Sequence, residues 1–259
     1  MTSYPWATAL VTGASSGIGE EMVRLLAAAG VPTTVVARRA DRLEALAREL
    51  DGIEVLAADL TADDGLARVA NRVSDAARPI ELLVNNAGFG NSGPFAELDP
   101  DRIDDEVRLN VGALTHLTRA AVDAMEAAGK GWVLNVSSVA SFQSAPHMAV
   151  YAATKAYVTS FSEALHAELK PSGITVTALC PGLTRTEFQD VAGAEGLGSR
   201  LPSLAWTSVE GVAKTGLSDC AKGKVLSVPG VQYKALTAMS DISPRWLTRR
   251  IASATMRYR

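Results

Sequence analysis

The chain has 259 residues, of which 47% are hydrophobic and 20% charged, and its formal net charge is −3. This length and composition predict one large globular domain, and the slight negative charge argues against a nucleic-acid partner. Two cysteines, and three histidines without metal-ligand spacing, argue against a disulfide framework and a metal site. No apolar run approaches the roughly 18 residues of a membrane span, and no signal peptide is recognised, so we expect a cytoplasmic protein without an integral membrane segment.

Short apolar runs alternate along the chain with longer segments of helical period. The runs predict strands at residues 7–11, 33–37, 53–57, 80–84, 132–136, 174–179 and 225–228. The helical segments are residues 20–29, 41–50, 66–77, 102–128 and 149–169. Apolar strands that alternate with helices predict a parallel sheet covered on both faces. We therefore expect a single α/β domain over residues 1–259, with a doubly wound, Rossmann-like sheet of about seven strands.

A glycine-rich segment, residues 12–19, joins the first predicted strand to the first helix. Glycines permit a tight turn and a close approach to a ligand, and the helix N-terminus that follows offers N–H groups to a pyrophosphate. The spacing Gly-x-x-x-Gly-x-Gly differs from the Gly-x-Gly-x-x-Gly fingerprint, and some glycine loops only turn the chain. The position between strand and helix favours a dinucleotide site, with candidate residues Gly13, Ser15, Ser16, Gly17, Ile18 and Gly19.

The end of the second predicted strand indicates the choice of cofactor. NAD sites place an acidic residue about twenty positions after the glycine loop, but here that position is Ala37, followed by Arg38 and Arg39. The next helix is predicted to begin at Asp41 with a capping box to Glu44, so both arginines precede the positive end of a helix dipole. An anion would stabilise them there, and a guanidinium binds phosphate through paired hydrogen bonds. We predict NADP(H) rather than NAD(H); two solvated surface arginines are the alternative.

Tyr151 and Lys155 lie four positions apart in a predicted helix and therefore share one face of it. The ammonium would favour the phenolate and lower the pKa of the tyrosine, which suits a general acid/base. Ser138, thirteen residues earlier (151 − 138), would be a second hydroxyl that holds a substrate oxygen. Its neighbour Ser137 is an alternative for that role, and a helix-surface pair without function is the alternative for the tyrosine and lysine.

With these residues placed, the chain resembles the short-chain dehydrogenase/reductase family along nearly its whole length. The resemblance rests on five motifs in family order: residues 12–19, residues 85–88, Asn110, Ser138 with Tyr151 and Lys155, and Pro181 with Gly182. It implies an oxidoreductase that transfers a hydride between NADP(H) and a carbonyl/secondary alcohol pair. Family members often form homodimers or homotetramers, which here would use the helices at residues 102–128 and 149–169.

The resemblance also implies roles for single residues. Tyr151 would donate and accept the proton, Lys155 would also hold the nicotinamide ribose, and Asn110 would hold a water in a proton relay. A polar residue that caps or kinks its helix is the alternative for Asn110. The remaining cofactor contacts implied are Asp59 and Leu60 at the adenine ring, Asn86, Ala87 and Gly88 after the fourth strand, and Pro181, Gly182 and Thr184 beside the nicotinamide.

The substrate is predicted less directly. Residues 140–148 contain no Arg or Lys to hold an anionic substrate, and the segments expected around the reacting carbon carry the apolar residues Phe89, Phe95, Phe142, Met148, Leu183, Phe188 and Trp206. These favour a hydrophobic ketone, aldehyde or secondary alcohol. The alternatives are a 3-oxoacyl-thioester reductase and a non-catalytic module that senses NADP(H). We also expect a mobile substrate loop near residues 183–208 and a basic C-terminal helix near residues 243–259, which would pack on the domain, a partner subunit or a membrane surface.

Overall fold

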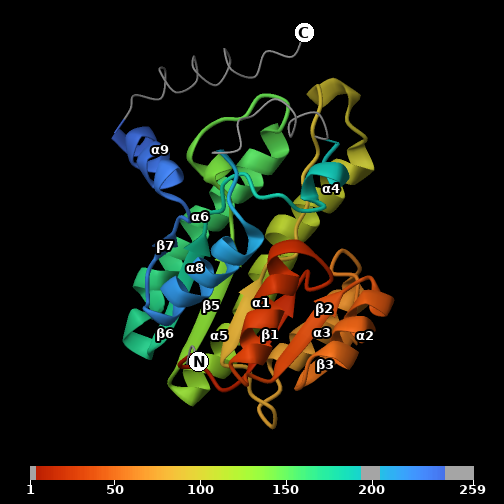
Figure 1. Ribbon diagram of the computed structural model, residues 1–259, viewed down its shortest axis with the longest axis vertical. Coiled ribbons are helices and arrows are strands. Elements are labelled where there is room, and N and C mark those ends of the chain that lie inside the picture. Colours follow the sequence, from red (N-terminus) through yellow and green to blue (C-terminus); the bar gives the residue numbers. More distant parts are fainter. Residues whose placement is uncertain (1–3, 194–204, 243–259) are drawn as a thin grey trace.

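Within the described part of the chain, residues 4–193 and 205–242 of a computed structural model, seven parallel strands form one sheet (Figure 1). The strands are β1 (Ala9–Thr12), β2 (Thr33–Ala37), β3 (Ile53–Ala57), β4 (Leu82–Asn85), β5 (Gly131–Val136), β6 (Ile174–Leu179) and β7 (Leu226–Ser227). Their order is β3-β2-β1-β4-β5-β6-β7. The predicted doubly wound α/β fold is therefore confirmed.

Helices follow the strands in turn. The α-helices are α1 (Gly17–Ala28), α2 (Ala40–Glu49), α3 (Asp63–Val73), α4 (Pro100–Val107), α5 (Leu114–Ala128), α6 (Ala149–Leu169), α7 (Phe188–Val191), α8 (Val209–Ala221) and α9 (Val231–Ile242). Short 3-10 helices are η1 (Phe95–Glu97), η3 (Val139–Phe142) and η4 (Lys170–Ser172). No helix in the described residues is both long enough and apolar enough to cross a membrane.

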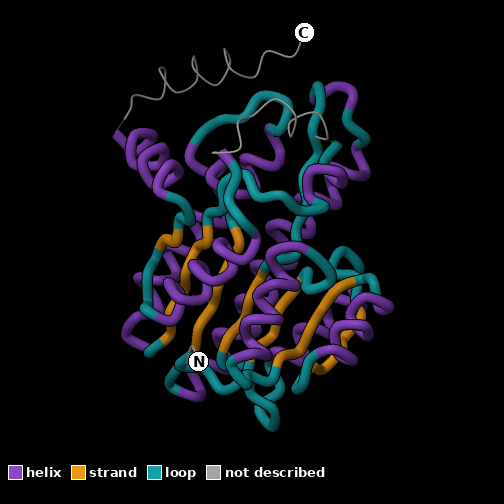
Figure 2. Tube along the Cα trace, viewed as in Figure 1, coloured by secondary structure: helices purple, strands orange, loops and turns teal. Residues whose placement is uncertain are grey.

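The sheet has a hydrophobic core on each face, because successive residues of a strand point to opposite sides. Val11 and Val35 belong to the core that α1, α2 and α8 cover, whereas Leu10 and Val36 belong to the core under α3, α5 and α6. Figure 2 shows the helices on both sides of the strands. All four side chains are fully buried, and each such burial stabilises the fold by roughly 1.5–3 kcal/mol.

The structure differs from the predicted helix boundaries in two places that matter for the site. The segment 102–128 is not one α-helix, because a π-helical turn, η2 (Arg108–Ala113), separates α4 from α5. Helix α2 begins at Ala40 rather than Asp41, and its N-cap residue Arg39 makes no side-chain cap hydrogen bond. The predicted capping box is therefore wrong, and Arg39 itself stands at the helix end.

The loops that follow the strands gather at one end of the sheet, at the top of Figure 1. The strand order reverses between β1 and β4, which is where open α/β sheets bind their ligands. Of the predicted substrate loop, residues 183–193 and 205–208 are described, and a bridge between Thr184 and Thr207 joins its two ends. Residues 194–204 and the basic helix predicted near 243–259 lie outside the described residues.

Candidate active site

The glycine loop between β1 and α1 is packed against Asn86 of the loop after β4. Gly13 and Gly17 have φ values of +66° and +58°, which side chains rarely adopt. A Cβ on Gly13 would lie 2.7 Å from Asn86 Nδ2, and one on Gly19 would overlap the same atom. Asn86 Nδ2 in turn donates to the carbonyl oxygens of Thr12 and Gly13, at 2.9 and 3.2 Å. Glycine is therefore required here by contacts within the protein.

The N-terminus of α1 is suited to an anion. Ser16 is its N-cap residue in an extended conformation, and its side chain makes no cap hydrogen bond within the described structure. The N–H groups of the first helical turn are thus left for a ligand, at the positive end of the helix dipole. This donor set fits the pyrophosphate of a dinucleotide cofactor.

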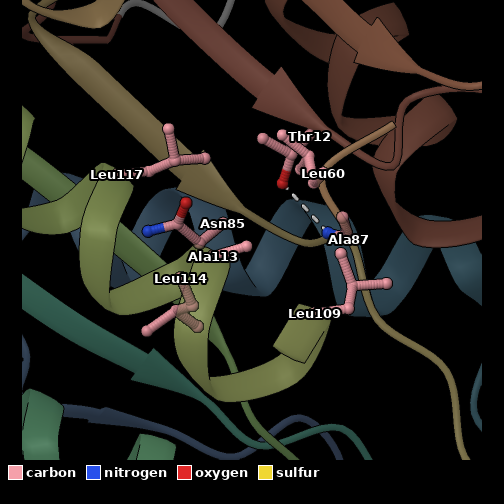
Figure 3. Close-up of a pocket in the computed structure, with 8 residues that line it drawn as sticks. All are labelled: Thr12, Leu60, Asn85, Ala87, Leu109, Ala113, Leu114 and Leu117. Atoms are coloured by element: carbon pink, nitrogen blue, oxygen red, sulfur yellow. Dashed lines mark hydrogen bonds between the residues drawn. The ribbon is translucent and has the colours of Figure 1, made fainter. Parts of the chain in front are cut away.

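Thr12 fastens the loop after β4 to the end of β1. Its hydroxyl oxygen accepts hydrogen bonds from the backbone N–H groups of Asn86 and Ala87, both at 3.0 Å. Figure 3 shows the bond from Ala87. Below it lies a cavity of about 10 Å³, enough for a single water. Leu60, expected beside the adenine ring, lines this cavity and is 5% exposed. Its side chain therefore supports the loop from below.

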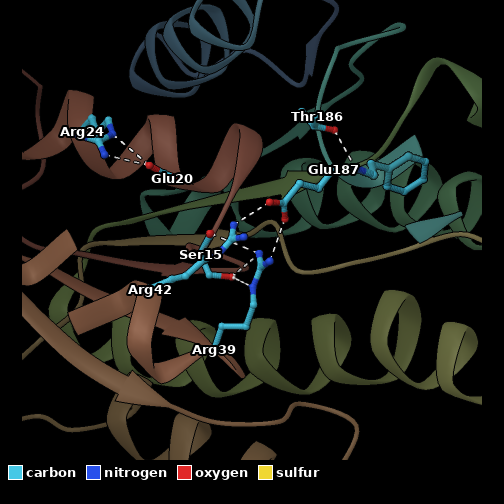
Figure 4. Close-up of polar contacts among 8 residues, drawn as sticks. Ser15, Glu20, Arg24, Arg39, Arg42, Thr186 and Glu187 are labelled. Carbon is cyan, nitrogen blue, oxygen red and sulfur yellow. Dashed lines mark hydrogen bonds and ion pairs between the residues drawn. The ribbon is translucent and has the colours of Figure 1, made fainter. Parts of the chain in front are cut away.

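A cluster of charges stands beside the glycine loop, at the end of β2 (Figure 4). Arg39 donates through Nε and Nη2 to Ser15 Oγ, at 3.1 and 3.0 Å, and through Nη1 to Glu187 Oε2 at 2.8 Å. Arg42 Nη1 binds the other oxygen of Glu187 at 2.7 Å. The two arginines lower the pKa of the Glu187 carboxyl to about 2. Arg38 takes no part in the ion pairs of this cluster among the described residues, and its side chain is 73% exposed.

Two members of this cluster, Arg42 and Glu187, were not predicted from the sequence. Arg42 follows Arg39 by three positions, so a shared helix face was a usable signal. Glu187 follows it by 148 positions, and only the fold brings the two together. Asp59, the predicted adenine contact, accepts two hydrogen bonds from Thr61 in the turn after β3, and its Oδ2 lies 4.0 Å from Arg38 Nη1.

Four residues predicted from three separate motifs lie together beyond the ends of β4 and β5. They are Gly88, Asn110, Tyr151 and Lys155. Tyr151 and Lys155 are 9% and 5% exposed. Lys155 Nζ donates to the carbonyl oxygen of Val136 at 2.8 Å and lies 5.7 Å from the centroid of the Tyr151 ring. A Cβ on Gly88 would lie 3.4 Å from Lys155 Nζ and 2.8 Å from Asn110 Oδ1. The absence of a side chain at residue 88 leaves the backbone close to both groups.

Burial controls the protonation of the tyrosine and the lysine. It raises the pKa of Tyr151 to about 12, and a hydrogen bond with the Ser138 side chain offsets this only in part. Burial also lowers the pKa of Lys155 to about 8, because a charged ammonium is poorly solvated there. The lowered tyrosine pKa that we expected from the lysine is therefore not found in this structure. Tyr151 is a protonated hydrogen-bond donor at neutral pH.

The two neighbouring serines have different surroundings. Ser137 is buried, and its hydroxyl binds the carbonyl oxygen of Lys155 at 2.8 Å and Thr159 Oγ1 at 2.7 Å. Ser138 is the N-cap of η3, where its Oγ accepts from Ala140 N at 3.1 Å, and it reaches Tyr151. The geometry thus gives Ser137 a structural role and leaves Ser138 beside the tyrosine.

Asn110 lies within the π-helical turn and is 1% exposed. Its amide donates to the carbonyl oxygen of Phe89 at 2.8 Å and to Thr154 Oγ1 at 3.1 Å, and its Oδ1 accepts from Phe89 N at 3.1 Å. The side chain therefore joins the loop after β4 to α6. Such turns interrupt the regular hydrogen bonding of a helix and frequently lie at functional sites.

The segment after β6 closes the site from the other side. Gly182 is required because a Cβ there would overlap the ring of Tyr233 in α9. Pro181 accepts a backbone hydrogen bond from Val139, and Thr184 binds Gly182 O at 3.1 Å within the loop. Thr186, which the sequence did not single out, instead faces the glycine loop. Its Cγ2 lies 3.1 Å from a Cβ built on Gly17.

The apolar residues predicted around the substrate are only partly assembled. The ring of Phe188 lies beside that of Tyr151, with centroids 5.2 Å apart. Phe142 and Leu183 pack instead against a small core under α9, and Phe95 is 64% exposed. Phe188 therefore borders Tyr151.

A buried carboxyl, Glu106 of α4, was also missed. It is fully buried, and its Oε2 accepts from the backbone and side-chain nitrogens of Asn91 at 3.1 and 2.7 Å. Its Oε1 has no hydrogen-bond partner among the described residues. Burial raises the pKa of this carboxyl, which also lies close enough to Lys155 and Tyr151 to influence their titration.

Comparison with known proteins gives a consistent result. The family model described as short chain dehydrogenase matches residues 7–195. A short chain dehydrogenase of Pseudocercospora fijiensis is 35% identical over 204 residues, which cover 76% of this chain and 66% of that protein.

Three solved structures share the fold. A short-chain dehydrogenase from Sphingobium yanoikuyae in complex with NADPH has a TM-score of 0.82 and 37% identity, covering 92% of this chain and 97% of that one. The bulky-bulky ketone specific alcohol dehydrogenase from Comamonas testosteroni has a TM-score of 0.79 and 33% identity, covering 97% and 95%. A 3-ketoacyl-(acyl-carrier-protein) reductase from Brucella melitensis, complexed with NADH, has a TM-score of 0.77 and 27% identity, covering 85% and 95%.

Proposed function

The chain belongs to the short chain dehydrogenase family of oxidoreductases, and we propose that it transfers a hydride between NADP(H) and the carbonyl/secondary alcohol pair of a hydrophobic small molecule. The observation that carries the proposal is the meeting of Tyr151, Lys155 and Ser138 beyond the carboxyl ends of β4 and β5. Complete acid/base machinery argues against a module that only senses the cofactor.

The residues act as follows in carbonyl reduction. The nicotinamide cofactor supplies the hydride. Ser138 and Tyr151 donate hydrogen bonds to the substrate oxygen, and Tyr151 gives its proton to that oxygen as negative charge develops on it. Lys155 holds positive charge near the tyrosine and would bind the ribose hydroxyls of the cofactor, while Asn110 fixes the loop after β4 against α6. In alcohol oxidation Tyr151 takes the proton back.

The preference for NADP(H) rests on the charge cluster at the end of β2. Arg39 and Arg42 present guanidinium donors to one anion, Ser15 Oγ orients Arg39 by accepting hydrogen bonds from it, and guanidinium groups suit a phosphate. The NADPH complex of the relative from Sphingobium yanoikuyae supports this choice, whereas the NADH complex of the reductase from Brucella melitensis represents the other. Arg39 and Arg42 carry our assignment more strongly than the exposed Arg38.

A hydrophobic ketone is the favoured substrate, because Phe188 borders Tyr151 and the Comamonas testosteroni relative is specific for bulky-bulky ketones. A 3-oxoacyl thioester is the second candidate, favoured by the likeness to the ketoacyl reductase of Brucella melitensis.

We further propose a cytoplasmic homodimer or homotetramer assembled through α5 and α6. The half-exposed Tyr157 of α6, which binds Thr115 of α5 at 3.0 Å, lies on the surface of these two helices. The cytoplasmic location is supported by the two buried free cysteines, which suit a reducing compartment.

The test is a panel of bulky ketones, aldehydes and acyl thioesters, each followed by NADPH and NADH consumption. We expect turnover of bulky ketones with a lower KM for NADPH than for NADH. Arg39→Ala should raise the KM for NADPH by about tenfold or more, the value of one charge-assisted phosphate contact, and leave the KM for NADH nearly unchanged. A lower KM for NADH in the wild type would contradict the cofactor assignment.

A further inference from the structure

Glu187 occupies an anion site that the chain otherwise offers to a ligand. The carboxylate is held at both oxygens, by Arg39 Nη1 at 2.8 Å and Arg42 Nη1 at 2.7 Å (Figure 4). Arg39 is oriented in turn by two hydrogen bonds to Ser15 Oγ of the glycine loop. Two guanidinium groups that converge on paired oxygens form the geometry in which arginine binds phosphate.

We propose that Glu187 is an internal competitor for the 2′-phosphate of NADP(H), and that it must leave Arg39 and Arg42 before the cofactor binds. This inference rests on the proposed use of NADP(H). It adds a residue, Glu187 of the segment between β6 and α7, that sets the discrimination between cofactors with and without the 2′-phosphate.

The charges favour such an exchange. Two guanidinium groups share the single carboxylate of Glu187. A phosphate monoester carries about −1.5 to −2 at neutral pH and offers three acceptor oxygens, so it matches the pair better than a carboxylate does. The side chains of Arg39, Arg42 and Glu187 are 40%, 45% and 42% exposed. Ion pairs this exposed are weak and break readily.

The competitor is connected to the reacting end of the site. Thr186, the preceding residue, packs against Gly17 of the cofactor loop, and Phe188, the next residue, lies beside Tyr151. Displacement of Glu187 therefore acts on a segment that contacts both the cofactor loop and the tyrosine. A cofactor without the 2′-phosphate leaves the contact between Glu187 and the arginines in place.

Direct binding to the full chain tests the proposal without turnover. The probes are 2′,5′-ADP, which carries the 2′-phosphate, and 5′-AMP, which does not, titrated by calorimetry. Glu187→Gln should bind 2′,5′-ADP about threefold to tenfold more tightly than the wild type, because the arginines are then released from the carboxylate. Binding of 5′-AMP should change by less than about twofold. Glu187→Ala should give the same gain in affinity for 2′,5′-ADP, which shows that the amide that glutamine introduces is not the cause.

Glu44→Gln is the matched control, because it removes the same charge from the exposed surface of α2, and Glu44 forms no ion pair with Arg39 or Arg42 among the described residues. An unchanged or weaker affinity for 2′,5′-ADP in both Glu187 variants would overturn the proposal, as would an equal gain in Glu44→Gln. A wild type that binds 5′-AMP as tightly as 2′,5′-ADP would instead contradict the proposed NADP(H) preference. The two failures are therefore distinguishable.

Discussion

Lys155 Nζ lies 5.7 Å from the centroid of the Tyr151 ring while it donates a 2.8 Å hydrogen bond to the carbonyl oxygen of Val136. The lysine is thus tied to the end of β5 and stands beside the tyrosine at a fixed distance. Burial nevertheless dominates the titration of both groups, with the pKa of Tyr151 raised to about 12 and that of Lys155 lowered to about 8. In this arrangement the tyrosine holds its proton, which suits it to donate that proton to a carbonyl oxygen.

The raised pKa of Tyr151 predicts opposite pH dependences for the two directions of the reaction. Oxidation needs the phenolate, so kcat/KM for an alcohol should rise from about pH 6 to about pH 8, the range in which Lys155 keeps its charge. Reduction uses the protonated phenol, so kcat/KM for a ketone should not rise over the same range. Steady-state rates in both directions, at saturating cofactor, measure this. An alcohol profile that is flat over that range would show that the tyrosine does not titrate as the structure indicates.

The two neighbouring serines should respond differently to substitution by alanine. Ser138→Ala should lower kcat/KM by about 10²-fold to 10³-fold, the usual cost of losing a donor to a developing oxyanion, while the free energy of unfolding falls by only about 1 kcal/mol. Ser137→Ala should cost about 1–3 kcal/mol of stability, because it removes a buried hydroxyl that binds both the carbonyl oxygen of Lys155 and Thr159 Oγ1. Urea unfolding and rate measurements on both variants separate the two roles. The reverse pattern would transfer the substrate contact to Ser137.

Glu106 should make the protein less stable as the pH rises. Burial raises the pKa of the Glu106 carboxyl in the folded state above its value in the unfolded state, so the folded state holds the proton more tightly. This tighter proton binding stabilises the fold fully at a pH below the unfolded-state pKa. The stabilisation is lost as the pH rises through the folded-state pKa. In Glu106→Gln, the fall in the free energy of unfolding should be smaller by up to about 1.4 kcal/mol per pH unit. Urea unfolding from about pH 5 to about pH 8 measures the slope. Glu168→Gln, on the exposed face of α6, is the matched control, and an identical slope in wild type and Glu106→Gln would refute the prediction.

The features predicted correctly from the sequence are those with a local signal. The sheet follows from apolar runs and helical periods, and the glycine loop follows from its place between β1 and α1. The pairing of Arg42 with Glu187 spans 145 positions, and the burial of Glu106 depends on how α4 packs, so no local pattern contains either. The tyrosine pKa was misjudged for the same reason. The spacing of Tyr151 and Lys155 gives their proximity, but only the packed site gives their desolvation.

The role of Tyr151 is tested most directly by Tyr151→Phe, with turnover of a bulky ketone and binding of NADPH measured on the same preparation. The variant keeps the ring beside Phe188 and removes only the hydroxyl. We predict that kcat falls by about 10²-fold to 10⁴-fold, the contribution of a positioned general acid. The Kd for NADPH should change by less than about threefold. Turnover that persists near the wild-type rate, with NADPH still bound, would contradict the assignment of Tyr151 as the proton donor.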